Sequence, residues 1–231
     1  MIGIIGAIDK ELLLFFQKMT IEKTEMISDK TFYIGKIGRH NVVVVKSGIG
    51  KVNAAITATL LLSRYSCRIV INTGVAGGLS PIGIGDIILA KGIAYFDVSL
   101  TEIDDVPYGQ MGDDPLIIKT NEYFLAKAEK VFKKLGYSYQ VGNLVSGDKF
   151  VTEKKTIRKI LRNVDDVIGV EMEGMAIAIT AYKFKVPFIS IRGVSDILDS
   201  ADQTVVYKNV ATEVANKTTK FVFSFLEVVD E

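Results

Sequence analysis

A chain of 231 residues with 48% apolar residues is long and apolar enough to bury the core of one α/β domain. Its formal net charge of +1 gives no electrostatic basis for binding nucleic acid or an anionic membrane surface. The single cysteine, Cys67, and the single histidine, His40, exclude a disulfide within the chain, a thiolate metal cluster and a multi-histidine metal site. We therefore expect no metal, no cofactor, no membrane segment and a cytoplasmic location.

The first third of the chain alternates apolar runs with helical patterns. Residues 2–7 are continuously apolar and predict a buried strand rather than a signal peptide. Residues 8–19 predict a helix that carries Glu11 in its first turn. The next expected elements are a hairpin (31–38 and 41–47), a helix (52–65), a buried strand (68–72) and a glycine-rich loop (73–78).

The rest of the chain continues the same alternation. The expected elements are a strand pair or one long bent strand (85–97), an irregular segment (98–116), a helix (117–135), a strand (140–145), a helix (153–163) and a closing helix (205–228). Neither an internal repeat nor a linker interrupts this order, so we expect residues 1–231 to form a single domain.

Residues 166–196 contain the most informative pattern. Two short apolar runs flank an alanine-rich helical pattern, which predicts a βαβ unit with a parallel strand pair. Both predicted strands carry their charged residues at the carboxyl end. In open parallel sheets the ligand crevice lies outside that end of the strands.

Small or acidic residues follow each of the five predicted buried strands. They are Glu11, the 73–78 loop, Ser146 with Asp148 and Phe150, Glu171 with Glu173, and Arg192 with Ser195 and Asp196. Separate carboxylates in one crevice can act as general acid and general base. Such a pair suits hydrolysis of a glycosidic bond through an oxocarbenium-like transition state, and leaves open whether the bond is O- or N-glycosidic.

Each of these residues also has a structural explanation. Glu11 is favoured by the helix dipole, Asp196 can cap a turn, and Glu171 can pair with Arg192. Taken singly, the structural explanation is the better one, but five strand ends together favour a site. Residues 48–51 (Gly-Ile-Gly-Lys) lack the spacing of a phosphate-binding loop.

Six sequence blocks, in order from residue 2 to residue 196, resemble those of one family. The chain is similar to bacterial 5′-methylthioadenosine/S-adenosylhomocysteine nucleosidases, the hydrolase branch of the nucleoside phosphorylase superfamily. The blocks are Gly-Ile-Ile-Gly-Ala with Glu11, Ser-Gly-Ile-Gly-Lys-Val-Asn-Ala-Ala (47–55), Asn-Thr-Gly-x-Ala-Gly-Gly (72–78), Val-Ser-Gly-Asp-x-Phe (145–150), Val-Glu-Met-Glu (170–173) and Val-Ser-Asp (194–196).

The resemblance implies a three-layer α/β/α fold with a mixed, partly closed central sheet, and a homodimer. It implies that water cleaves the bond between adenine N9 and ribose C1′ of methylthioadenosine or adenosylhomocysteine, a step of methionine salvage. It also implies that a small nucleoside is the only ligand, with no cofactor.

The same resemblance implies a role for individual residues. Asp196 is the expected general acid for adenine N7, held by Ser195, and Glu11 is the expected base for the attacking water, with Arg192 nearby. Glu173 is expected on the ribose hydroxyls. The remaining expected substrate contacts are Gly77, Phe150, the backbone of Val151, Met172 and Tyr207.

The chain departs from the family pattern at some positions. Val75 stands where the family usually has serine, and the stretch 95–113 matches poorly. The preferred 5′-substituent of the substrate is therefore open. So are three alternatives on the same fold: a purine nucleoside phosphorylase, a futalosine-type hydrolase and a nucleoside-binding module without catalysis.

Overall fold

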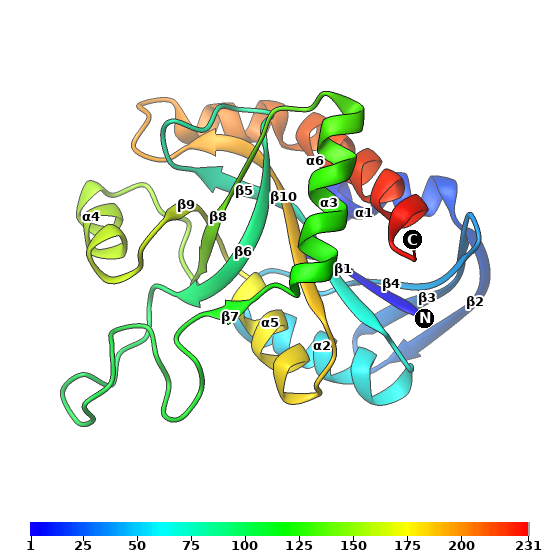
Figure 1. The fold of residues 1–231 in the computed structure, drawn as a ribbon, viewed down its shortest axis with the longest axis horizontal. Helices are drawn as coiled ribbons and strands as arrows, with labels where there is room; N and C mark the ends of the chain where they lie inside the picture. Colours follow the sequence, from blue (N-terminus) through cyan, green and yellow to red (C-terminus); the bar gives the residue numbers. More distant parts are fainter. Residues whose placement is uncertain (231) are drawn as a thin grey trace.

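The computed structural model describes residues 1–230, which form a mixed sheet between two layers of helices (Figure 1). The elements are β1 (Ile2–Gly6), α1 (Asp9–Lys18), β2 (Thr20–Ile27), β3 (Lys30–Ile37), β4 (His40–Lys46), α2 (Lys51–Arg64), β5 (Ile69–Gly78), β6 (Ile87–Tyr95), β7 (Ile118–Lys119), α3 (Glu122–Leu135), β8 (Tyr139–Ser146), α4 (Lys154–Asn163), β9 (Val167–Glu171), α5 (Gly174–Lys183), β10 (Phe188–Ile197) and α6 (Gln203–Val228). None of the described helices is long and apolar enough to cross a bilayer.

The two layers follow from the alternation of side chains along the buried strands. In β4, Val42 and Val44 belong to the core that also holds residues of α1, α3 and α6, whereas Val43 and Val45 belong to the core on the other face, with residues of α2 and α5. Because both faces are covered, the strands are apolar at consecutive positions. The predicted three-layer α/β/α fold is confirmed (Figure 1).

The sheet contains two sets of strands that run in opposite directions. β1, β4, β5 and β10 are parallel to one another, and β6, β8 and β9 are parallel to one another but antiparallel to the first set. β5 pairs with both β9 and β10, so the five strands β5, β10, β6, β8 and β9 close into a ring. The predicted mixed, partly closed sheet is therefore confirmed.

The prediction of a parallel strand pair within residues 166–196 is wrong. β9 and β10 do not pair with each other: β5 lies between them, parallel to β10 and antiparallel to β9. A strand–helix–strand pattern identifies the elements, but it does not reveal that a third strand is inserted between them. The carboxyl end of β9 nevertheless reaches β5, because Gly77 pairs with Val170 and Gly78 with Gly169.

Two other elements have different bounds from the prediction, and one strand was not predicted. Residues 73–78 are not a loop but the second half of β5, which extends in register with β10 as far as Gly78. The edge strand β2 was not predicted, because most of its residues are exposed and it lacks an apolar alternation. α3 begins at Glu122 rather than at 117, where Asn121 caps it by accepting from the backbone N–H of Tyr123 and Phe124.

Candidate active site

A pocket lies where the carboxyl ends of the two strand sets meet, and the space within it, open solvent included, is about 600 Å³. The polar residues around it come from α1, β9, β10, the start of α6 and the segments after β8 and before α5. Its lining includes Glu11, Val75, Gly77, Phe150, Val151, Glu171, Met172, Glu173, Ser195, Asp196, Gln203 and Tyr207.

Asp196 is a buried carboxyl group near the end of β10, directly after a register irregularity between Val194 and Asp196. Ser195 Oγ donates to its Oδ1 at 2.7 Å, and Gln203 Nε2 donates to its Oδ2 at 2.8 Å. Burial raises the pKa of Asp196, and these two donors oppose the rise. A buried carboxyl group with a raised pKa is suited to donate a proton to a ligand.

Glu11 is held on the opposite wall by backbone donors. It is buried in the first turn of α1, directly after β1. Its Oε2 accepts from the N–H groups of Ala7 (2.6 Å) and Ile8 (3.1 Å), and its Oε1 accepts from Val75 N–H at 2.9 Å. These three backbone donors fix the position of the Glu11 carboxylate.

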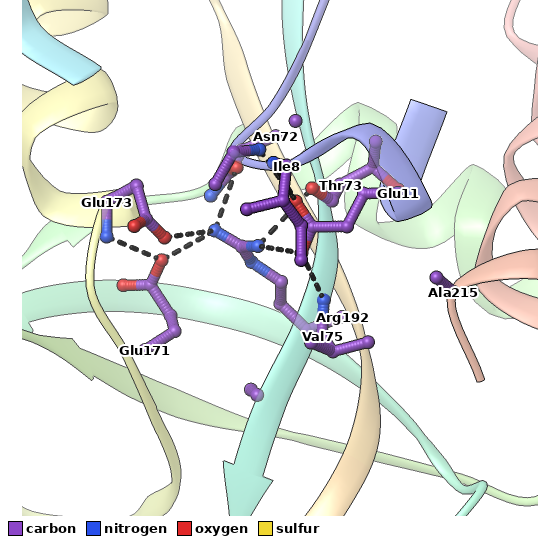
Figure 2. Close-up of polar contacts among 12 residues, drawn as sticks. Ile8, Glu11, Asn72, Thr73, Val75, Glu171, Glu173, Arg192 and Ala215 are labelled. Carbon is purple, nitrogen blue, oxygen red and sulfur yellow. Dashed lines mark hydrogen bonds and ion pairs between the residues drawn. The ribbon is translucent and has the colours of Figure 1, made fainter. Parts of the chain in front are cut away.

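Arg192 lies behind the pocket and is 1% exposed. Its guanidinium Nη2 donates to Glu171 Oε2 at 2.6 Å, and its nitrogens lie 3.6 Å from Glu11 Oε1 and 3.7 Å from Glu173 Oε2. We call these four residues the Arg192 cluster (Figure 2). Three carboxylates around one guanidinium place excess negative charge at this wall, which suits a ligand that becomes positive as it reacts.

Glu171 is the most firmly held member of the Arg192 cluster. Besides Arg192, its Oε2 accepts from the N–H groups of Glu173 (3.0 Å) and Gly174 (2.6 Å), so it serves the N-terminus of α5. Its Oε1 accepts from Ser146 Oγ. These contacts agree with the structural pairing that the sequence favours for this residue.

Glu173 differs from the other two carboxylates of the Arg192 cluster. Burial, and next the neighbouring Glu171 carboxylate, raise its pKa to about 7, against the opposing effect of Arg192. Its Oε1 accepts from Gly50 N–H at 2.9 Å, which connects it to the turn before α2.

The remaining walls are apolar and aromatic. Phe150 and Tyr207 face each other edge to face, with ring centroids 5.6 Å apart, and both line the pocket. Gly77 leaves room beside the acid, since a Cβ there would lie 3.1 Å from Asp196 Oδ2. A flat apolar ring with polar edges fits between such walls.

The structure brings all the predicted site residues together except Arg192, which touches the carboxylates from behind instead of lining the pocket. Gln203 was not predicted. It lies six positions after the end of β10, whereas the sequence prediction considered only residues at the strand ends. It reaches Asp196 because α6 begins over the pocket. No group of three or more His, Cys, Asp or Glu residues in 1–230 is placed to hold a metal ion.

A partly closed mixed sheet between helices, with a carboxylate-lined pocket at its strand ends, defines a nucleoside phosphorylase-like protein. The model of the phosphorylase superfamily matches residues 1–227, so the chain belongs to this superfamily. Within it, the chain belongs to the 5′-methylthioadenosine/S-adenosylhomocysteine nucleosidase family. It is 36% identical over 230 residues to the enzyme of that name from Staphylococcus haemolyticus, covering 99% of this chain and 100% of the relative.

Solved structures agree with this assignment. The Streptococcus pyogenes S-adenosylhomocysteine nucleosidase in complex with 5-methylthiotubericidin superposes with a TM-score of 0.93 at 34% identity, covering 98% of this chain and 95% of that one. The futalosine hydrolase of Helicobacter pylori superposes with a TM-score of 0.92 at 26% identity, covering 98% and 97%. The fold is thus common to both enzymes, and the higher identity is to the nucleosidase.

Proposed function

We propose that the protein hydrolyses the N-glycosidic bond of 5′-methylthioadenosine and S-adenosylhomocysteine and releases adenine. The observation that carries this proposal is a buried acid, Asp196, across one pocket from a firmly held carboxylate, Glu11. Membership of a family of nucleosidases supports the reaction, and the relatives' names supply the two substrates.

Departure of the base comes first in the proposed mechanism. Protonated Asp196 donates its proton to adenine N7, so that the electron pair of the N9–C1′ bond leaves with the base. Positive charge then develops at C1′ and the ring oxygen of the ribose. The carboxylates of Glu11 and Glu173 stabilise this charge, because they lie in a buried pocket where electrostatic interactions are strong.

Attack by water completes the reaction. Glu11 accepts a proton from the water as its oxygen bonds to C1′, and the products are adenine and a free 5-thio-substituted ribose. Three backbone donors hold the Glu11 oxygens in place before the substrate arrives. Glu173 accepts hydrogen bonds from the ribose hydroxyls in this proposal, and the ring of Phe150 stacks on the base.

Phosphorolysis is the main alternative, and the charges of the pocket argue against it. A phosphate nucleophile needs free cationic donors at the position of the attacking water. Arg192 is already surrounded by Glu11, Glu171 and Glu173, which would repel phosphate. The carboxylates therefore favour water as the nucleophile.

Turnover of a substrate panel tests the proposal. We expect adenine release from methylthioadenosine and adenosylhomocysteine without phosphate, and slower turnover of inosine and futalosine. A strict requirement for phosphate contradicts the hydrolase proposal. Faster turnover of futalosine than of either adenosine derivative contradicts the substrate assignment.

We also propose a cytoplasmic homodimer that acts in methionine salvage. Exposed apolar side chains lie on α2, on the end of α5 and in the segment 98–116, and the Lys183–Asp114 ion pair (2.6 Å) connects the last two. A second copy of the chain would cover this face, because apolar residues gathered on a monomer surface typically mark an interface. The free thiol of Cys67 suits a reducing compartment.

A further inference from the structure

One side chain already occupies the hydrogen-bonding positions of the pocket that hold the base in the proposed reaction. Gln203, the first residue of α6, is 3% exposed. Its Nε2 donates to Asp196 Oδ2 at 2.8 Å and to the Val151 carbonyl oxygen at 2.9 Å. The two acceptors fix the orientation of the amide, since the reverse orientation would set Oε1 against two acceptor oxygens.

The amide nitrogen of Gln203 has the chemistry of the exocyclic amino group of a 6-aminopurine. Both are planar NH₂ groups with two hydrogens in fixed directions. A base with N7 at the Asp196 carboxyl and its edge at Val151 directs its 6-amino group at these same two oxygens. A 6-oxopurine has an acceptor at this position and cannot make either bond.

The third polar atom of this arrangement is unsatisfied. Gln203 Oε1 is buried and accepts no hydrogen bond from any residue in the described part of the chain. A buried acceptor without a donor raises the free energy of the conformation that contains it. In the ligand-free protein Gln203 thus satisfies the acceptor oxygens of Asp196 and Val151, but its own Oε1 stays without a donor. This unfavourable term is removed when Gln203 leaves the pocket.

We propose that Gln203 is a positioning residue that occupies the amino-group position of the ligand-free pocket and is displaced by the 6-amino group of the substrate. This inference rests on the proposed function. Before binding, Gln203 donates to Asp196 Oδ2 and to the Val151 carbonyl oxygen; after displacement the 6-amino group of the substrate donates to the same two oxygens, and N7 lies at the Asp196 carboxyl group. Substrates with a 6-amino group are selected because only they replace both hydrogen bonds.

Replacing Gln203 changes none of the titratable side chains that lie around Asp196. The titratable side chains that line the same pocket are Glu11 of α1, Lys149 after β8, Glu171 of β9, Glu173 before α5 and Tyr207 of α6. None of them donates a hydrogen bond to Asp196, whose only side-chain donors are Ser195 and Gln203 among residues 1–230. Replacing Gln203 therefore removes one of the two side-chain donors to Asp196 and leaves the other, Ser195, in place.

Binding of adenine and hypoxanthine to the full-length protein tests the competition. We expect Gln203→Ala to bind adenine about threefold to tenfold more tightly than wild type in calorimetry, the range of one hydrogen bond, with no gain for hypoxanthine. The control Gln17→Ala changes an exposed glutamine on α1 and should change neither affinity. Unchanged or weaker adenine binding to Gln203→Ala overturns the proposal, as does an equal gain for hypoxanthine.

A second measurement needs no ligand. The pKa of the Asp196 carboxyl, followed by NMR titration of the free protein, should rise in Gln203→Ala because a donor to the carboxylate is lost. Gln203→Met, which keeps the length of the side chain, should give the same rise if the alanine variant does not fold. An unchanged or lower pKa overturns the proposal. A wild type that binds no adenine contradicts the proposed function instead, and the titration still decides the role of Gln203.

Discussion

At the scale of single residues, the three acids of the proposed reaction differ in what surrounds each carboxyl group. Asp196 receives two side-chain donors, Glu11 receives three backbone donors, and Glu173 receives one backbone donor beside another carboxylate. Burial raises the pKa of both Asp196 and Glu173, and each has different hydrogen-bond donors, so chemically similar groups can take different roles in one pocket.

Replacing the proposed general acid should abolish most of the activity. Asp196→Asn keeps the size of the side chain and can still donate to N7, but it cannot transfer a proton. We expect adenine release to fall by about 10²–10⁴-fold in kcat, the usual contribution of a general acid. Steady-state assays on methylthioadenosine measure this, with unchanged circular dichroism as the control for folding. Turnover equal to wild type would remove Asp196 from the mechanism.

Glu173 should make the stability of the protein depend on pH. Its pKa is about 7 in the folded protein, against 4.5 for a glutamate exposed to water as in the unfolded chain. The folded protein therefore binds the proton more tightly. Its stabilising contribution is therefore complete below pH 4.5 and is lost as pH rises through about 7. Urea unfolding across this range should show a smaller decline for Glu173→Gln than for wild type. An identical decline in both proteins would contradict the raised pKa.

The sequence reveals the acids more readily than their partners. Glu11, Glu171, Glu173 and Asp196 each follow an apolar run, which is a local signal. Gln203 has no such signal, since it contacts Val151 from 52 positions away and only the path of the chain brings them together. Arg192 is recognisable in sequence, but its position behind the carboxylates depends on how α1, β9 and β10 come together.

At the scale of elements, β5 organises the site. It pairs with β1, β10 and β9, and its second half passes between the acids on either side. Gly74 of this strand has a φ of +144° and leaves the space in which Glu11 and Arg192 approach each other. The closure of the sheet and the geometry of the site therefore depend on the same strand.

A side chain at position 74 should disrupt the Arg192 cluster. A Cβ there would lie 2.1 Å from Glu11 Oε1 and 2.5 Å from Arg192 Nη1, far inside contact distance. We expect Gly74→Ala to lose activity and about 2 kcal/mol or more of stability, measured by urea unfolding. Gly38→Ala is the control, because its φ is also positive (+56°) but its Cβ would meet nothing within 4 Å. Equal stability losses in the two variants would show that crowding at position 74 has no effect.

The elements themselves were largely predictable, whereas their pairing was not. Continuous apolar runs identified β1, β4 and the first half of β5, because strands covered on both faces are apolar at consecutive positions. The insertion of β5 between β9 and β10 is a long-range arrangement that leaves no local pattern. The exposed strand β2 was missed for the opposite reason, since it has little apolar surface to reveal it.

At the scale of the whole molecule, the apolar face on α2, α5 and the segment 98–116 should hold two copies together. Ile103 is 77% exposed and lies in this segment. We expect a dimeric mass for wild type in light scattering and a shift towards monomer for Ile103→Glu, because a charge at an apolar interface is costly to bury. Leu161→Glu is the control, as Leu161 is half exposed on α4. A monomeric wild type would contradict the proposed dimer.

The central claim is that water, not phosphate, is the nucleophile that bonds to C1′ of the ribose. Product analysis tests this claim most directly. The protein is incubated with methylthioadenosine in excess phosphate, and the products are identified by mass spectrometry. The carboxylates around Arg192 lead us to expect adenine and free methylthioribose at a rate independent of phosphate. Methylthioribose 1-phosphate as the main product would contradict the account.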